Sequence, residues 1–276
     1  MNQSEKAEDF RRQHRENKLL LLPNVWDTLT ARLVASAGFR SLATASFSVA
    51  AANGYEDGEK IPFHNSVKVV TEIANAVDVP VSVDFERGYG NDLASLADNV
   101  RQLLDAGVIG INIEDRASTG KDLLPVNEQC KKLETIREAG IKYGVNIFIN
   151  ARTDAYLLKT SNNFMDDVIE RGKAYQNAGA DCFYPILIDN YQDIERVLAA
   201  ISIPMNVMLM SQVGDLKKLE DIGVKRVSLG PGSLRYVLTK LRNMVVNLAN
   251  YDTTDFFSEE LISNNGIMSL IKKSHP

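Results

Sequence analysis

Acidic side chains recur in this chain directly after short apolar runs, a spacing suited to binding a metal ion. Asp84 and Glu86 follow the run PVSV, Glu114 closes GINIE, and Asp57 lies in the polar segment NGYEDG. Strand alternation predicts that Asp84 and Glu86 lie on the same side of their strand, with Phe85 opposite. Carboxylates brought together in a cleft of low dielectric repel one another, and a divalent cation relieves this repulsion. Because no His or Cys lies beside them, these oxygen ligands favour Mg²⁺ or Mn²⁺ over zinc. We expect Asp84 to bind Mg²⁺ directly and the other three to bind it directly or through water. For a single aspartate, a helix cap or an arginine partner is the alternative.

Arg152 is the candidate binding group for an anionic substrate. It follows the run NIFINA, and a guanidinium can bind a carboxylate through two parallel hydrogen bonds. An ion pair with Asp154 or Glu114 is the alternative interpretation. Mg²⁺ together with an arginine suits a small 2-oxo acid, whose enolate is stabilised as negative charge develops on the 2-oxo oxygen. We expect Arg152, Asp57 and Glu114 to take part in catalysis.

Four further residues are candidates for contact with the substrate. The turn at Ser46 and Phe47 could offer main-chain N–H donors. Asn206 is a polar residue within the otherwise apolar run PMNVML. Trp26 follows the first apolar run. It either forms the floor of the site or packs against the first helix, and the sequence leaves both open.

All these residues belong to a repeating pattern of strands and helices. Eight short runs, most of them apolar on both faces as buried parallel strands are, alternate with segments of helical period. The runs cover residues 19–23, 41–46, 80–85, 109–114, 146–151, 181–186, 204–209 and 225–229. Several helical segments end in Ala-Gly, which is typical of a helix C-terminus. The pattern predicts an α/β fold of the (β/α)8 TIM-barrel type, in which functional residues lie at the carboxyl ends of the strands. An open doubly wound sheet is the alternative, although no GxGxxG motif follows the first run.

The pattern divides the chain into three parts. We expect an N-terminal helix within residues 1–17, the barrel over 18–250, and a helical extension over 251–276. The extension either packs on its own barrel or reaches a partner subunit, and the sequence leaves both open.

Composition narrows the class of protein. With 276 residues, 45% hydrophobic and 24% charged, the chain has ordinary globular usage and is long enough for one barrel of about 250 residues. A net charge of −5 argues against a nucleic-acid partner, and no apolar stretch of about 18 residues could span a membrane. Cys130 and Cys182 form no zinc motif or disulfide framework, so we expect a cytoplasmic protein with Cys182 in the core. We expect His14, His64 and His275 on the surface.

Seven motifs occur in an order that is specific to one family. They are LPNVWDTLTARLVASAGF, TASFSVAAANGYEDGE, PVSVDFERGYG, GINIEDR, INARTDAY, AGADCFYP and RVSLGPG. From about residue 18 to residue 240 the chain closely resembles the isocitrate lyase/phosphoenolpyruvate mutase superfamily, and within it the small lyase-like branch.

The resemblance implies a fold, a cofactor and a substrate class. It implies a (β/α)8 barrel whose eighth helix is exchanged with a neighbouring subunit, giving homodimers or homotetramers. It implies Mg²⁺ bound by Asp84, a substrate carboxylate bound by Arg152, and main-chain donors at Ser46 and Phe47. Three acidic positions would contact the metal mainly through water: Asp57, Glu86 and Glu114. The implied reactions are C–C cleavage, decarboxylation, or formation and cleavage of P–C bonds, generally through 2-oxo acids or their enolates.

The departures from the family lie in the residues that select the reaction. The loop at 115–125 lacks both the lyase motif Lys-Lys/Arg-Cys-Gly-His and the mutase motif Lys-x-Asn-Ser, although Lys121 could be a displaced remnant of the latter. Glu86 stands where the family commonly has Asp. After the sixth strand, Tyr184-Pro185-Ile186 replaces the glutamate or histidine of the known branches.

Three functions follow from these observations. The first is a Mg²⁺-dependent lyase or decarboxylase acting on a small 2-oxo or 2-hydroxy carboxylic acid, favoured because decarboxylation demands least from an acid thiol. The second is P–C chemistry, as a phosphonopyruvate hydrolase or a phosphoenolpyruvate phosphonomutase. The third is a non-catalytic metabolite-binding protein that keeps the metal-binding residues.

Overall fold

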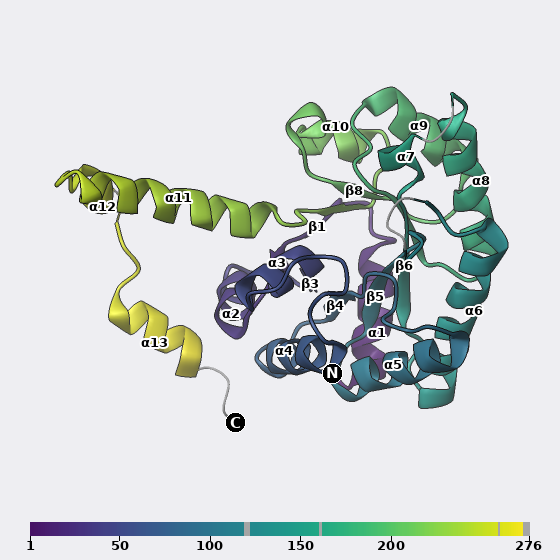
Figure 1. Cartoon of the computed structure of the whole chain (residues 1–276), viewed down its shortest axis with the longest axis horizontal. Helices are drawn as coiled ribbons and strands as arrows, with labels where there is room; N and C mark the ends of the chain where they lie inside the picture. Colours follow the sequence, from purple (N-terminus) through teal and green to yellow (C-terminus); the bar gives the residue numbers. More distant parts are fainter. Residues whose placement is uncertain (119–121, 160–161, 259, 273–276) are drawn as a thin grey trace.

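Short parallel strands form the centre of the molecule (Figure 1). The computed structural model describes residues 1–118, 122–159, 162–258 and 260–272. The strands are β1 (Leu20–Leu22), β2 (Asn24–Val25), β3 (Leu42–Thr44), β4 (Val81–Asp84), β5 (Gly110–Glu114), β6 (Phe148–Thr153), β7 (Cys182–Pro185), β8 (Asn206–Met208) and β9 (Arg226–Ser228). They pair in parallel in the orders β2-β3-β4-β5-β6-β7 and β1-β9-β8.

Two seams join these sheets into a closed barrel. Pro23, which has no N–H to donate, separates β1 from β2, so that β1 pairs with β9 while β2 pairs with β3. At the other seam, a parallel bridge between Phe183 and Met205 links β7 to β8. With β1 and β2 counted as one interrupted strand, the eight predicted strands are all present. The (β/α)8 prediction is therefore confirmed, and the open-sheet alternative is wrong.

Helices alternate with the strands, as the glycine-terminated segments predicted. They are α2 (Thr28–Ser36), α3 (Ser46–Ala52), α4 (Phe63–Asn75), α5 (Leu93–Asp105), α6 (Val126–Tyr143), α7 (Ala155–Leu158), α8 (Phe164–Asn177), α9 (Tyr191–Ala200), α10 (Leu216–Asp221) and α11 (Gly232–Ala249), with a 3₁₀ turn at Ser211–Val213. Aspartate side chains cap two of them: Asp27 accepts from Thr30 N and Asp92 from Ser95 N, each at 2.7 Å.

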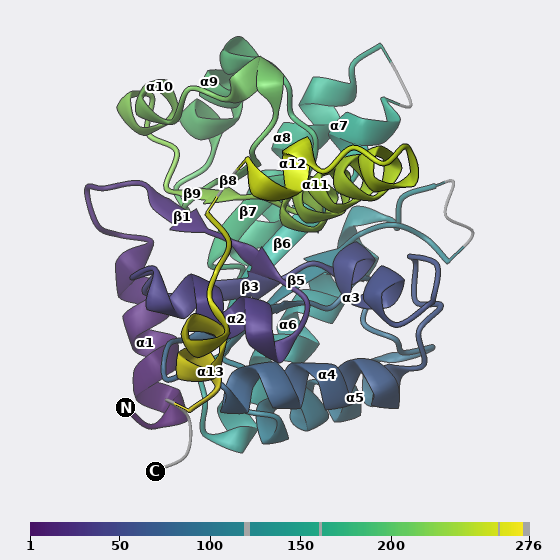
Figure 2. The same cartoon turned by 90° about the vertical axis from the view of Figure 1, so that its left-hand side faces the viewer.

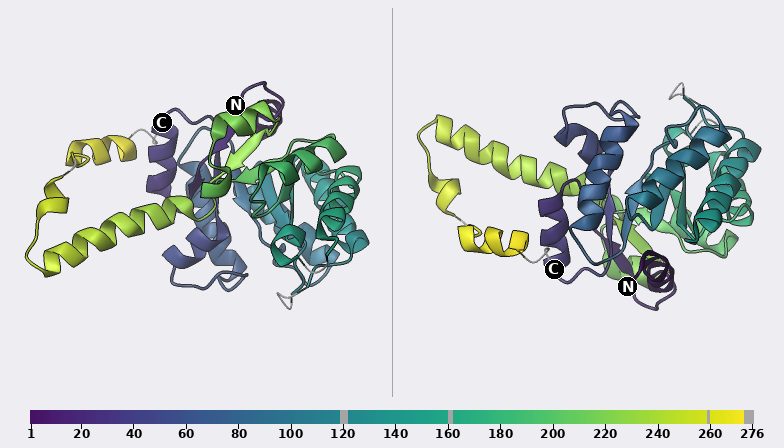
Figure 3. Two further views of the ribbon diagram at one scale, coloured as in Figure 1. Left: turned by 90° about the horizontal axis from the view of Figure 1, so that it is seen from above. Right: turned by 90° about the horizontal axis from the view of Figure 1, so that it is seen from below.

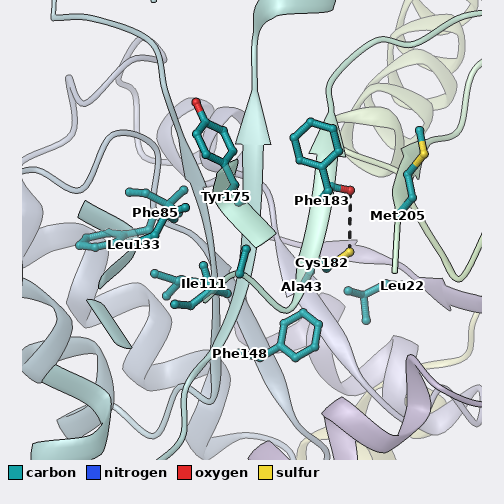
Figure 4. Packing of buried hydrophobic residues seen from close by; sticks show 14 of the residues in the cluster. Leu22, Ala43, Phe85, Ile111, Leu133, Phe148, Tyr175, Cys182, Phe183 and Met205 are labelled. Atoms are coloured by element: carbon teal, nitrogen blue, oxygen red, sulfur yellow. Dashed lines mark hydrogen bonds between the residues drawn. The ribbon is translucent and has the colours of Figure 1, made fainter. Parts of the chain in front are cut away.

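Most buried apolar side chains of the strands and of the surrounding helices pack into one large core cluster, while others form separate smaller clusters. Figure 4 shows Ile111, Phe148 and Phe183 among them, all with at most 1% of their surface exposed. Cys182 lies in the same cluster and is fully buried, so the expectation that it is a core residue is confirmed.

Helix α1 (Gln3–Gln13) covers the amino end of the barrel (Figure 2). The Arg11 guanidinium bonds to Asp181 and to the carbonyl of Asn146, which precede β7 and β6. The His14 ring stacks on Phe148 with centroids 4.2 Å apart, and His14 is only 1% exposed. The prediction of a surface His14 is therefore wrong, because contacts far along the chain bury this end of the helix. His64 is exposed as expected, and His275 lies outside the described residues.

Helix α11 projects away from the barrel (Figures 1 and 3). Its exposed apolar side chains are Tyr236, Val237, Leu238, Leu241, Val245, Val246 and Leu248. After α12 (Thr254–Phe257) the chain returns, and α13 (Asn264–Lys272) lies beside α2, where Arg32 Nη1 donates to the carbonyl of Ile271 at 2.9 Å. In the described segments, no helix combines the length and the apolar character needed to cross a membrane.

Candidate active site

A cavity of about 240 Å³ lies within the barrel, at the carboxyl ends of its strands. Six of the predicted site residues line it: Ser46, Phe47, Asp57, Asp84, Arg152 and Asn206. They come from different segments of the chain, and the barrel brings them together because every parallel strand ends at the same rim.

Asp84, the last residue of β4, is held by hydrogen bonds to both carboxylate oxygens. Ser46 donates to Oδ2 from its main-chain N at 3.0 Å and from Oγ at 2.7 Å. Asn112 Nδ2 donates to Oδ1 at 2.8 Å. These bonds fix the direction of the carboxylate. They also use the Ser46 N–H, which we had expected to bind substrate.

Asp57 shares the cavity with Asp84, from the loop after α3. Partial desolvation and the negative charge of Asp84 raise the pKa of Asp57. Two repelling oxygen donors without a nearby His or Cys fit a hard divalent cation. Within the described residues, no group of three or more His, Cys, Asp or Glu side chains could hold a metal ion. An ion here would therefore take most of its octahedral ligands from water and substrate, as Mg²⁺ commonly does.

Arg152 reaches the cavity from β6 and is already paired with two carboxylates. Its Nη1 lies 2.8 Å from Glu114 Oε2, and its Nε lies 2.7 Å from Asp154 Oδ1. Burial lowers the pKa of Arg152, but Glu114 and Asp154 raise it by more, so the guanidinium stays charged. Arg152 therefore lines the cavity and also forms the ion pairs of the alternative interpretation, while its binding of a substrate carboxylate stays a prediction.

Glu114 and Glu86 are buried but do not line the cavity. Burial raises the pKa of Glu114 to about 7, against the opposite effect of Arg152. The Glu86 carboxylate accepts from Tyr89 Oη at 2.7 Å and from Glu59 N at 2.5 Å. Burial raises the pKa of Glu86 to about 8. Strand alternation suggested that Glu86 continues the face of Asp84, but the strand ends at Asp84 and Glu86 has a left-handed φ of 51°.

Trp26 does not line the cavity either. Its side chain packs with Val49, Ala50, Ile61 and Leu234 in a separate apolar cluster. The expectation that it forms the floor of the site is not supported, because the chain leaves the barrel after β2 and Asp27 begins α2.

Seven polar residues that sequence reasoning did not select as site residues also line the cavity: Asn24, Thr44, Asn112, Asn150, Tyr184, Arg226 and Ser228. Asn150 Nδ2 donates to Asn112 Oδ1 at 2.9 Å, which extends the hydrogen-bond chain that begins at Ser46 and Asp84. Polar residues at alternate positions of otherwise apolar strands were the available signal, since they share the interior face of the barrel.

The loop after β5 borders a second cavity, of about 430 Å³, lined among others by Arg87, Arg116 and Lys132. Asp115 anchors the start of this loop, accepting from Thr153 Oγ1 at 2.6 Å and from Arg171 Nη1 at 3.0 Å. Lys121, the possible remnant of a mutase motif, lies outside the described residues.

Comparison with known proteins agrees with this geometry. The family model described as phosphoenolpyruvate phosphomutase matches residues 10–249. Oxaloacetate decarboxylase 1 of Pseudomonas putida (strain W619) is 31% identical over 74% of this chain and 71% of its own.

Two solved structures share the fold. A provisionally assigned phosphonomutase from Burkholderia cenocepacia J2315 has a TM-score of 0.85 and 36% identity, covering 89% of this chain and 99% of its own. A phosphonopyruvate hydrolase, solved with oxalate and Mg²⁺, has a TM-score of 0.85 at 20% identity, covering 99% and 96%. The chain belongs to the phosphoenolpyruvate phosphomutase family, within the isocitrate lyase/phosphoenolpyruvate mutase superfamily.

Proposed function

We propose that this protein is a Mg²⁺-dependent carbon–carbon lyase or decarboxylase acting on a small 2-oxo or 2-hydroxy carboxylic acid. The observation that carries the proposal is the fixed carboxylate of Asp84 in one cavity with the guanidinium of Arg152. The likeness to an oxaloacetate decarboxylase supports the reaction class.

Asp84 is the proposed direct ligand of the metal, and Asp57 the proposed ligand through water. Glu86 and Glu114 remain proposed to contact the metal, but only indirectly, because neither side chain lines the cavity. When bound, Mg²⁺ would supply a Lewis acid that polarises the 2-oxo oxygen and stabilises negative charge in the transition state. Mn²⁺ prefers the same oxygen ligands and is the proposed substitute.

Arg152 is the proposed binding group for the substrate carboxylate. Its ion pairs with Glu114 and Asp154 hold the guanidinium in one orientation. Phe47 and Asn206 are the proposed residues beside the substrate, since both line the cavity. Decarboxylation suits this arrangement, because carbon dioxide leaves without needing the acid thiol that the loop at 115–125 lacks.

The test is decarboxylation of oxaloacetate at saturating Mg²⁺ by the wild type and by Asp84→Ala. We expect turnover in the wild type and a loss of at least about 100-fold in the variant, since it removes the proposed direct ligand. Absence of wild-type turnover would contradict the decarboxylase proposal. Thermal stabilisation by 2-oxo acids without any turnover would indicate a non-catalytic metabolite-binding protein instead.

P–C chemistry is the second candidate, favoured by the 36% identity to the provisionally assigned phosphonomutase. Incubation with phosphonopyruvate and Mg²⁺, followed by ³¹P NMR, separates the two candidates. Release of inorganic phosphate would indicate a hydrolase, and formation of phosphoenolpyruvate a mutase.

We also propose that the protein is a homodimer or homotetramer in which α11 packs on a neighbouring subunit. The exposed apolar side chains of α11 support this, since exposed patches of this kind commonly mark protein–protein contacts. An apolar cavity of about 580 Å³ at the base of α11, lined by Trp26, Leu33 and Tyr236 among others, is the proposed place for the exchanged helix.

A further inference from the structure

We propose that Arg226 is a second anion-binding residue at the deep end of the cavity, selecting dicarboxylic over monocarboxylic acids. The proposal rests on the proposed function and names its substrate class. Arg152 and Arg226 would bind the two ends of one substrate, with Asp84 near both.

Arg226 is a buried cation that forms no ion pair with any of the described residues. It is the first residue of β9, lines the cavity and is 3% exposed. Its Nε and Nη1 are buried and donate a hydrogen bond to no group in the described part of the chain. Among the ion pairs formed by the described residues, none includes Arg226.

The two arginines of the cavity therefore differ in their charge balance. Arg152 has Glu114 and Asp154 within 2.8 Å, whereas no carboxylate of a described residue lies at ion-pair distance from Arg226. Burial lowers the pKa of Arg226, against a smaller opposite effect of Asp84, but a guanidinium remains charged at neutral pH. A buried, unpaired charge is costly to fold, and an anionic ligand would relieve that cost.

The groups around Arg226 are neutral and suited to hydrogen bonding. Asn206 lies directly opposite in the register of β8 and β9, and its buried Oδ1 forms no hydrogen bond with the residues that the structure describes. The buried Oδ1 of Asn150 likewise has no hydrogen-bond partner in the described segments. If the Asn206 amide turned over, its oxygen could accept from Ser228 Oγ and its N–H could donate to an anion. The side of Arg226 away from the cavity offers an aromatic ring, with the Phe10 centroid 6.0 Å from Cζ.

The alternative is that Arg226 is structural and is satisfied by water at the base of the barrel. The two interpretations predict different ligand preferences. If Arg226 is satisfied by water, replacing it should have the same effect with every ligand. If Arg226 binds an anion, replacing it should weaken the binding only of acids that carry a second carboxylate.

The experiment compares two ligands by isothermal titration calorimetry in Mg²⁺. Pyruvate carries one carboxylate, and 3,3-difluorooxaloacetate carries two. We expect the wild type to bind the diacid more tightly. In Arg226→Met the Kd of the diacid should rise about 10- to 100-fold, as expected for the loss of charge-assisted hydrogen bonds, while the Kd of pyruvate changes by less than about threefold. Arg226→Lys should recover part of the preference, and Arg152→Met should weaken both ligands.

A second variant covers the case in which Arg226→Met does not fold. Asn206→Asp places a carboxylate opposite Arg226 and should remove the preference for the diacid without deleting the arginine. An unchanged ratio of the two Kd values in either folded variant would overturn the inference alone. If the wild type prefers the diacid but decarboxylates nothing, the proposed reaction fails and Arg226 keeps its assignment. If the wild type binds neither acid, both proposals fall.

Discussion

One oxygen of Asp84 accepts two hydrogen bonds from Ser46, one from the main chain and one from the hydroxyl. Since α3 begins at Ser46, this pair connects the first turn of a helix to the end of the neighbouring strand β4. The orientation of the proposed metal ligand therefore depends on how that turn is placed.

Ser46→Ala should keep the main-chain bond to Asp84 and lose the hydroxyl bond. We expect the affinity for Mg²⁺ to fall about 10-fold or more, because groups that orient a metal ligand typically contribute that much. Titration of Mg²⁺ by calorimetry measures this directly. Ser48→Ala is the matched control on the same helix, since Ser48 Oγ is buried without a partner among the described residues. Equal Mg²⁺ affinities in the two variants would exclude the orienting role of Ser46.

Arg152→Met should cost stability as well as activity. The substitution leaves the buried carboxylate of Glu114 without its arginine and leaves Asp154 paired with Arg116 alone. Breaking a buried pair typically costs about 3–5 kcal/mol. Urea unfolding provides the measurement. Arg101→Met, which removes the exposed pairs with Asp98 and Asp105, should change the free energy of unfolding by less than about 1 kcal/mol. Similar losses of unfolding free energy in the two variants would show that burial does not make the Arg152 ion pairs more important for stability.

Leu241→Glu should dissociate the proposed oligomer. Leu241 lies on α11 and is 50% exposed in the single chain, so a charge there would be buried against a neighbouring subunit. Size-exclusion chromatography with light scattering should show the wild type as a dimer or tetramer and the variant as a monomer. Asn243→Glu adds the same charge at a polar position of the helix and should leave the mass unchanged. A monomeric wild type would rule out the exchange of α11.

His14 should make stability depend on pH. Burial and the charge of Arg226 lower the pKa of His14 to about 3, from about 6.5 in the unfolded chain. Between these values the unfolded state binds more protons, so this contribution is complete above pH 6.5 and is lost as the pH falls. Between pH 7 and pH 5 the wild type should lose about 2 kcal/mol more than His14→Phe, which cannot be protonated. Chemical denaturation at the two pH values tests this, and parallel losses would argue against a buried neutral His14.

The sequence predicted the barrel because its strands are apolar on both faces and its helices end at glycines. It predicted Asp84, Asp57 and Arg152 in the cavity because the strand ends of such a barrel meet at one rim. It misplaced Glu86, since alternation was extended past the point where the backbone becomes left-handed. It misplaced His14, because the partners that bury this side chain lie more than a hundred residues away in the chain.

Arg226 shows a different limit of sequence reasoning. A charged residue at the start of an apolar strand is commonly expected to be solvent-exposed. Only the pairing of β9 with β8 in the structure shows that the side chain of Arg226 lies inside the barrel. The lack of a partner for Arg226 is a three-dimensional property. The spacing of residues along the chain could not have predicted that Arg226 forms no ion pair with the described residues.

Helix α1, which covers the amino end of the barrel, bears on the order in which products dissociate. A fragment bound at the proposed site on Arg226 would lie between Phe10 of α1 and the mouth of the cavity, so we expect it to leave past Asp84 and Arg152. In a cleavage reaction the outer fragment would therefore leave first. The inner fragment would leave last and compete with the next substrate molecule, which makes it the expected competitive product inhibitor.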